Sequence, residues 1–120
     1  MQIKIPIRAL SVNKSSKGKH FKSPEYKKFE RDVTLLLPFN KEKPLEGELF
    51  VKYTFYFLNY TNSDTDNGVK LLQDILVARG YLKDDRYIKA EYAEKIKVDD
   101  IKDERILLEI VCYNDRYKIL

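Results

Sequence analysis

The residues of this chain best suited to chemistry are aspartates grouped in two places along the sequence. Asp64 and Asp66 are two positions apart, so in an extended segment their carboxylates point to the same side. Asp84 and Asp85 follow later in the chain. If the fold brings these carboxylates together, their mutual repulsion favours either protonation or the capture of a cation. Oxygen ligands without an accompanying histidine or thiolate favour Mg²⁺ or Mn²⁺ over zinc.

The segment between the two aspartate pairs has the pattern of an amphipathic helix from about Asp66 to Arg79. Asp66, Lys70 and Asp74 recur at every fourth position and form one polar stripe with Gln73. Apolar residues occupy the side expected to face a sheet: Val69, Leu72, Ile75 and Leu76. Gly80 follows at the position that favours a left-handed helix end. The pattern therefore lines up carboxylates and a lysine on one helix face, but it does not settle whether Asp84 and Asp85 come near them.

The aspartates allow two other interpretations. Asn62, Asp64 and Asp66 fall at the first three ligand positions of an EF-hand, but Asn67 stands where that loop needs glycine and Gln73 where it needs a bidentate acid. Those two mismatches argue against a calcium loop. The other interpretation, that the first pair of acids caps a helix and the second pair occupies a turn, stays open on the residues alone.

Other catalytic patterns find little support. His20 is the single histidine, so a histidine-based triad has one candidate only. Cys112 is the single cysteine, which excludes an intrachain disulfide and a multi-cysteine zinc site. It falls on an apolar strand, which predicts a core position rather than a nucleophile. The sequence contains no glycine-rich phosphate loop.

The elements that must position the aspartates follow from hydrophobic periodicity. Strands are predicted where apolar residues alternate, at about 3–7, 49–57, 87–95 and 105–112. A further helix is predicted from Ser23-Pro24-Glu25, a strong start signal, to Pro38. The order β-α-β-α-β-β ends in two consecutive strands, so we expect an α+β fold with a mixed four-stranded sheet and two helices on one side.

The basic residues are concentrated near the N-terminus. The net charge is +4, but the segment from Lys14 to Arg31 contains seven cations against two anions, a net charge of +5. Residues 14–22 have almost no apolar content and are interpreted as a mobile basic loop, which can meet phosphates at many points. A merely solvated loop explains the charge equally well.

Length and composition limit the class of protein. The chain has 120 residues, 43% of them hydrophobic and 35% charged, which predicts one globular domain over 1–120 with a C-terminal tail at 113–120. No apolar stretch is long enough to span a membrane or serve as a signal-peptide core. We therefore expect a soluble, cytoplasmic protein.

Several motifs in register resemble the RusA-like endodeoxyribonucleases, Holliday junction resolvases common in bacteriophages and prophages. The resemblance covers roughly residues 3–112. It rests on Ser11-Val12-Asn13, on the FKSPEYKKF segment at 21–29, on the series Asp64-x-Asp66-Asn67-x-x-Lys70-x-x-x-Asp74, and on Tyr81-Leu82-x-Asp84-Asp85-x-x-Ile88. The lysine-rich basic loop and the tail depart from the family pattern.

The resemblance implies a homodimer that nicks two opposed strands of four-way DNA, with Mg²⁺ as cofactor and Mn²⁺ able to substitute. It also implies that Asp64, Asp66 and Asp85 bind the metal and that Lys70 is needed for cleavage. Asp74 and Asp84 match family acids that would lie around the metal ligands without binding the metal directly. The residues expected to face DNA are Asn13, Lys14, Lys17, Lys19, Lys22 and Lys27. A non-catalytic DNA-binding protein with the same fold is the alternative.

Overall fold

The computed structural model describes residues 1–9, 16–17, 21–22, 24–59 and 66–120, without the side chains of residues 16, 17, 21, 22, 66 and 67. Four strands form one sheet: β1 (Gln2–Ile5), β4 (Leu49–Phe57), β5 (Ile88–Lys97) and β6 (Arg105–Cys112). Their order across the sheet is β1-β6-β4-β5. The β4–β5 pair is parallel, whereas β6 runs antiparallel to both β1 and β4. The predicted mixed four-stranded sheet is confirmed.

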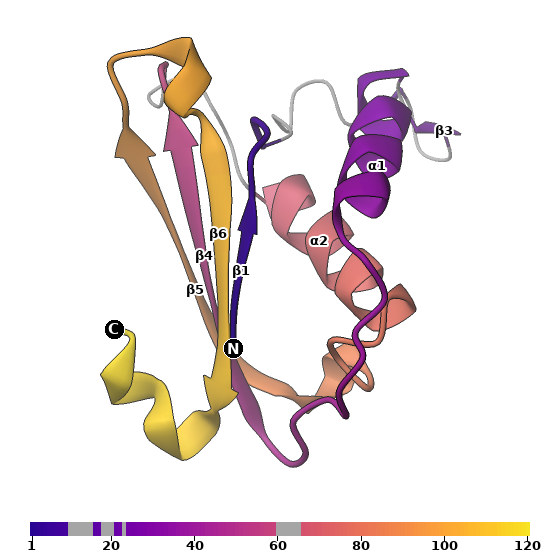
Figure 1. Ribbon diagram of the computed structural model, residues 1–120, viewed down its shortest axis with the longest axis vertical. Coiled ribbons are helices and arrows are strands. Elements are labelled where there is room, and N and C mark those ends of the chain that lie inside the picture. The colour runs from indigo at the N-terminus through magenta and orange to yellow at the C-terminus, as the bar shows by residue number, and fades with distance from the viewer. Residues whose placement is uncertain (10–15, 18–20, 23, 60–65) are drawn as a thin grey trace.

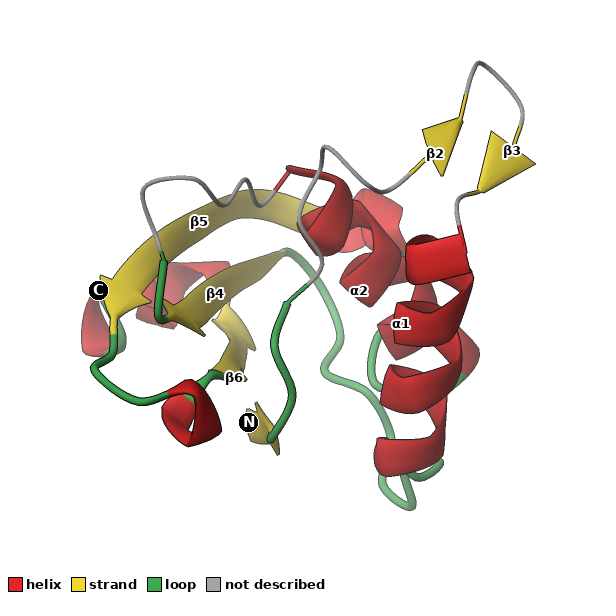
Figure 2. Cartoon of the chain, turned by 90° about the horizontal axis from the view of Figure 1, so that it is seen from above, coloured by secondary structure: helices red, strands yellow, loops and turns green. Residues whose placement is uncertain are grey.

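Two helices, α1 (Pro24–Leu36) and α2 (Asp66–Ala78), pack against one face of this sheet, as Figures 1 and 2 show. Helix α2 connects the parallel strands β4 and β5, so it runs back along the sheet between them. The α+β class and the element order predicted from the sequence are confirmed.

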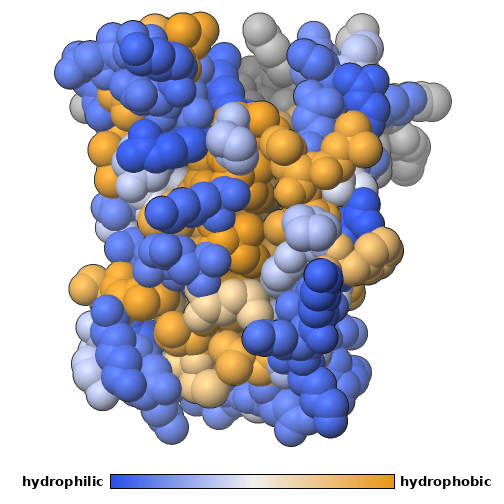
Figure 3. Space-filling model, in the orientation of Figure 1, coloured by the Kyte–Doolittle hydropathy of each residue, from blue (hydrophilic) through white to orange (hydrophobic). Residues whose placement is uncertain are grey.

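The core lies between the helices and the alternate residues of the strands. Every second residue of β4, from Leu49 to Phe57, is at most 1% exposed. On the helix side the buried residues include Phe29 and Val33 of α1 and a row on α2: Leu71, Leu72, Ile75 and Leu76. Figure 3 shows apolar residues reaching the surface in a band between the strands and the helices, with hydrophilic residues on both sides. Apolar burial therefore fixes which side of α2 faces the sheet and leaves its polar stripe outside.

The C-terminal end of α2 is fixed by backbone and side-chain hydrogen bonds. Gly80 has φ +80°, the left-handed conformation predicted for a helix end, and the N–H of Tyr81 donates to the carbonyl of Leu76 at 2.8 Å. The side chain of Asn40 donates to the carbonyl of Gly80 at 3.1 Å, and the Tyr81 hydroxyl donates to the carbonyl of Pro38 at 2.9 Å. These contacts place the chain that follows α2, and with it the second aspartate pair.

Strand β5 lies at the edge of the sheet and contains a bulge near its start. Leu49 pairs with Ile88, but Phe50 pairs with Ala90, so Lys89 is the extra residue. Beyond the bulge, Val51 pairs with Glu91. The inserted residue reverses the alternation of β5, and Glu91 therefore lies on the helix-covered face.

A buried carboxylate joins β6 to two other parts of the sheet. Glu104, only 9% exposed, precedes β6 and accepts a hydrogen bond from the backbone N–H of Leu58 at 3.1 Å. Arg8 approaches the same carboxylate oxygen at 3.3 Å. This charge-assisted contact holds the chain just after β4 beside the chain just after β1.

Some sequence predictions need correction or addition. Cys112, predicted to be a core residue rather than a nucleophile, lies at the end of β6 as expected but is only partly buried. Within the predicted basic loop, the short strands β2 (Ser16–Lys17) and β3 (Phe21–Lys22) pair with each other. The predicted tail contains a 3₁₀ helix, η5 (Tyr113–Lys118). None of the helices in the described residues is long and apolar enough to span a membrane.

Candidate active site

The second aspartate pair lies on a short 3₁₀ helix, η3 (Asp85–Tyr87), between α2 and β5. Asp84 caps this helix, because its Oδ1 accepts a hydrogen bond from the backbone N–H of Arg86 at 3.0 Å. One oxygen of the Asp84 carboxylate is therefore already hydrogen-bonded within its own turn. Asp85 is exposed at the first position of the helix.

The two aspartates of this pair have opposite pKa shifts. The hydrogen bond from the Arg86 N–H, followed by one shared with Asp85, holds the pKa of Asp84 below its ordinary value. The pKa of Asp85 is raised, first by that shared hydrogen bond with Asp84, then by partial desolvation and by the negative charges of Asp84 and Asp74. Asp85 is thus a carboxylate surrounded by negative charge, an environment that a nearby cation would relieve.

The negative charge of Asp74, on the polar stripe of α2, is the smallest of the effects that raise the pKa of Asp85. Asp85 also lines an open hollow of about 230 Å³ between α2 and the start of β5. The residues lining this hollow are Gln73, Asp85, Ile88, Lys89, Ala90 and Glu91. Gln73 of the polar stripe and Asp85 therefore line the same hollow, whereas Asp64 and the side chain of Asp66 lie outside the described residues.

A ring of three polar side chains closes one wall of this hollow. Gln73 of α2 donates through Nε2 to the Tyr53 hydroxyl at 2.9 Å and also to Oε2 of Glu91. The Tyr53 hydroxyl donates to the same Oε2 at 3.4 Å. Tyr53 is fully buried, and this burial is the main cause that raises its pKa above the ordinary range, so its hydroxyl stays protonated.

Sequence reasoning placed Gln73 on the polar stripe but did not find Tyr53 or Glu91 at the site. Tyr53 carried the signal of an ordinary core aromatic residue. Glu91 lies on the helix face only because of the β-bulge at the start of β5. Neither the periodicity of the strand nor its residue types predict the one-residue bulge that causes this change of face.

The structure describes the other predicted site residues only in part. Asp66 is the first residue of α2, while its side chain and all of Asp64 lie outside the described residues. Lys70 is exposed on α2, one turn before Asp74. Asp66 and Asp74 are eight positions apart, which corresponds to about 12 Å along a helix axis. The metal-binding role of Asp64, Asp66 and Asp85 and the role of Lys70 stay predictions.

The donor chemistry of the described residues fits a hard divalent cation better than zinc. The side chains near Asp85 that could bind a metal are the carboxylates of Asp74, Asp84 and Glu91. Oxygen donors of this kind suit Mg²⁺ or Mn²⁺. Within the described residues, however, no three acidic, histidine or cysteine side chains converge closely enough to form a metal site.

The predicted DNA-facing residues are also partly outside the described chain. Lys27 is exposed on α1. Lys17 and Lys22 lie on the paired strands β2 and β3, without described side chains. Asn13, Lys14 and Lys19 lie outside the described residues. Their contacts with DNA stay predictions.

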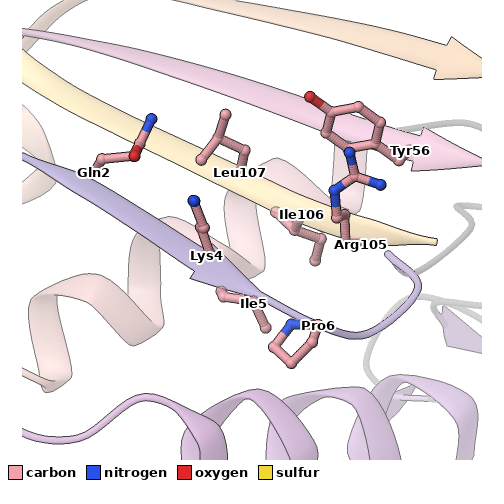
Figure 4. Close-up of a pocket in the computed structure, with 8 residues that line it drawn as sticks. All are labelled: Gln2, Lys4, Ile5, Pro6, Tyr56, Arg105, Ile106 and Leu107. Atoms are coloured by element: carbon pink, nitrogen blue, oxygen red, sulfur yellow. The ribbon is translucent and has the colours of Figure 1, made fainter. Parts of the chain in front are cut away.

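A second, larger hollow of about 450 Å³ lies at the opposite edge of the sheet, around β1 and β6 (Figure 4). Its lining includes two cations, Lys4 and Arg105, and no carboxylate. The Arg105 guanidinium lies over the ring of Tyr56, 3.8 Å from its centroid. Because it has no acidic ligand, this hollow is not a candidate for divalent-cation chemistry.

The fold and the candidate site together define an α+β domain with a carboxylate-lined hollow beside the helix that crosses between two parallel strands. Comparison with known protein families matches residues 8–111 to the family described as Endodeoxyribonuclease RusA. The match spans most of the 120 residues, so the chain belongs to the RusA endodeoxyribonuclease family. No match was found among curated proteins.

Proposed function

We propose that this protein is a Mg²⁺-dependent endodeoxyribonuclease that resolves Holliday junctions by paired, symmetric nicks in recombination and repair. The observation that carries the proposal is that the exposed Asp85 lines a hollow together with Gln73 of the helix that begins at Asp66, in a chain that belongs to the RusA family. A homodimer would present two such sites in symmetric positions. Such symmetry suits a four-way junction, in which two opposed strands must be cut.

In this proposal, Asp64, Asp66 and Asp85 hold the metal. A bound Mg²⁺ would lower the pKa of the attacking water and neutralise charge on the phosphate. Asp85 suits this role because it is exposed and lies in negative surroundings. Asp84 suits it less, since its Oδ1 already accepts the Arg86 N–H. Asp84 instead fixes the turn that presents Asp85.

Lys70 supplies a positive charge on the polar face of α2. Its exposed position allows the ammonium group to contact the scissile phosphate, where it would stabilise the charge that develops during cleavage. The basic segment ahead of α1 and the exposed Lys27 would hold flanking DNA through its phosphates.

Metal-dependent cleavage of a synthetic four-way junction tests the proposal. We expect no cleavage in EDTA, and we expect Mg²⁺ or Mn²⁺ to produce nicks at symmetric positions in two opposed strands. A linear duplex of the same sequence is the substrate control and should stay uncut. Junction binding without cleavage at any Mg²⁺ or Mn²⁺ concentration would instead indicate a non-catalytic DNA-binding protein.

A further inference from the structure

We propose that Glu91, together with Tyr53, is a positioning residue that holds Gln73 and thereby sets the polar face of α2 against the aspartate pair. This inference rests on the proposed nuclease function. It assigns a role to a carboxylate that is not among the residues of the family resemblance, and it concerns how the site is held rather than what the site cleaves.

The geometry of the ring makes Glu91 the common acceptor. Its Oε2 receives hydrogen bonds from both Gln73 and Tyr53, and Gln73 also donates to the Tyr53 hydroxyl. The three side chains come from β5, α2 and β4, so the ring joins one helix to two strands. Removing the Glu91 side chain would therefore remove two of the three hydrogen bonds of the ring.

The ring lies at the point where α2 carries its functional side chains. Gln73 directly precedes Asp74, follows Lys70 by about one helical turn, and lines the same hollow as Asp85. Apolar packing holds the opposite side of α2 but has no directional preference. The hydrogen bonds of Gln73 do have one, so within the orientation that apolar burial gives α2 they fix the position of its polar face more closely.

The β-bulge of β5 is what makes this contact possible. Without the extra residue Lys89, the alternation that starts at the Leu49–Ile88 pair would turn Glu91 to the face away from the helices. Glu94, three residues further on, lies on that opposite face, where it approaches Lys52 at 3.8 Å. The same strand therefore offers a matched control: a second glutamate with a polar partner that does not touch α2.

The test compares Glu91→Ala, Glu91→Gln and the control Glu94→Ala in the full chain. The measurements are the single-turnover rate of junction cleavage in Mg²⁺, the Kd for the junction in EDTA and the melting temperature. We expect Glu91→Ala to cleave about 10- to 100-fold more slowly, the size of effect that a small misplacement of reacting groups produces. Its Kd for the junction should stay within about twofold of the wild-type value, and Glu94→Ala should cleave at the wild-type rate.

The glutamine variant separates positioning from metal binding. The amide oxygen of Glu91→Gln can still accept from Tyr53 and Gln73, so this variant should recover most of the cleavage rate. If it cleaves as slowly as Glu91→Ala, the charge itself is needed and the positioning role is wrong. Wild-type cleavage by Glu91→Ala would also overturn the inference.

A second measurement does not depend on nuclease activity. The side-chain amide signals of Gln73, identified in an NMR spectrum by their loss in Gln73→Leu, should shift in Glu91→Ala and in Tyr53→Phe but not in Glu94→Ala. Tyr53→Phe also keeps the test open if Glu91→Ala does not fold. Unchanged Gln73 signals in both ring variants would overturn the inference. If the variants shift these signals as expected but the wild-type protein cuts no junction, only the proposed function is overturned.

Discussion

Replacing Asp66 with asparagine is expected to abolish cleavage of a four-way DNA junction. Asparagine keeps the size of the side chain, but it removes the negative charge that a divalent cation requires. Loss of several kcal/mol of metal-derived stabilisation of the transition state corresponds to a cleavage rate that is lower by about 10³-fold or more. The measurement is the single-turnover cleavage rate at saturating enzyme and Mg²⁺.

Junction binding provides the internal control for this variant. Asp66→Asn removes a negative charge, so its Kd for the junction in EDTA should equal or fall slightly below the wild-type value. Asp115→Asn is the matched carboxylate control, because Asp115 lies on η5 and pairs with Lys118 at 3.5 Å, away from α2. If Asp66→Asn cleaves the junction at a rate close to that of Asp115→Asn, the assignment of Asp66 as a metal ligand is wrong.

Lys70→Ala is expected to slow cleavage by about 10²- to 10³-fold, the effect of losing one group that stabilises transition-state charge. Lys70 is exposed, so truncation should leave the fold and the melting temperature nearly unchanged. The rate is measured with enzyme in excess over the junction, which separates the chemical step from binding. Lys102→Ala is the control, because Lys102 is also exposed but lies on the 3₁₀ helix η4 (Ile101–Asp103) before β6.

The two lysine variants distinguish a local role from a general effect of charge. If both slow cleavage equally and raising the enzyme concentration restores both rates, the lysines contribute only to attraction of DNA. A defect confined to Lys70→Ala that persists at saturation places Lys70 at the reacting phosphate. Wild-type cleavage by Lys70→Ala would leave it as a surface residue of α2, without a part in the reaction.

Most of the fold could be predicted from the sequence because its elements have strong periodic signals. The alternation from Leu49 to Phe57 predicted β4 with its observed limits, and Gly80 marked the end of α2. The 3₁₀ helices were not predicted, because a single turn with few apolar residues has too short a pattern to recognise. The order of strands in the sheet was also beyond the sequence, since it depends on long-range pairing such as that of β6 with β1 and β4.

The candidate site was predictable where it depends on helical spacing. The polar stripe with Lys70, Gln73 and Asp74 follows from positions three and four residues apart. The hollow that Gln73 and Asp85 line together does not, because it depends on how the chain turns after Gly80. The position of Glu91 at the site could not be predicted for a different reason, since a one-residue bulge decides which face of β5 it occupies.

Anomalous diffraction from crystals of the protein with junction DNA and Mn²⁺ tests the metal assignment most directly. The proposed ligands predict a manganese peak with carboxylate oxygens of Asp64, Asp66 and Asp85 at about 2.1 Å, the distance typical of a small hard cation. The three carboxylates can come from one chain or from both chains of a dimer, and the map would show which. A peak elsewhere on the protein, or bound DNA with Asp85 far from both other aspartates in every chain, would contradict the account.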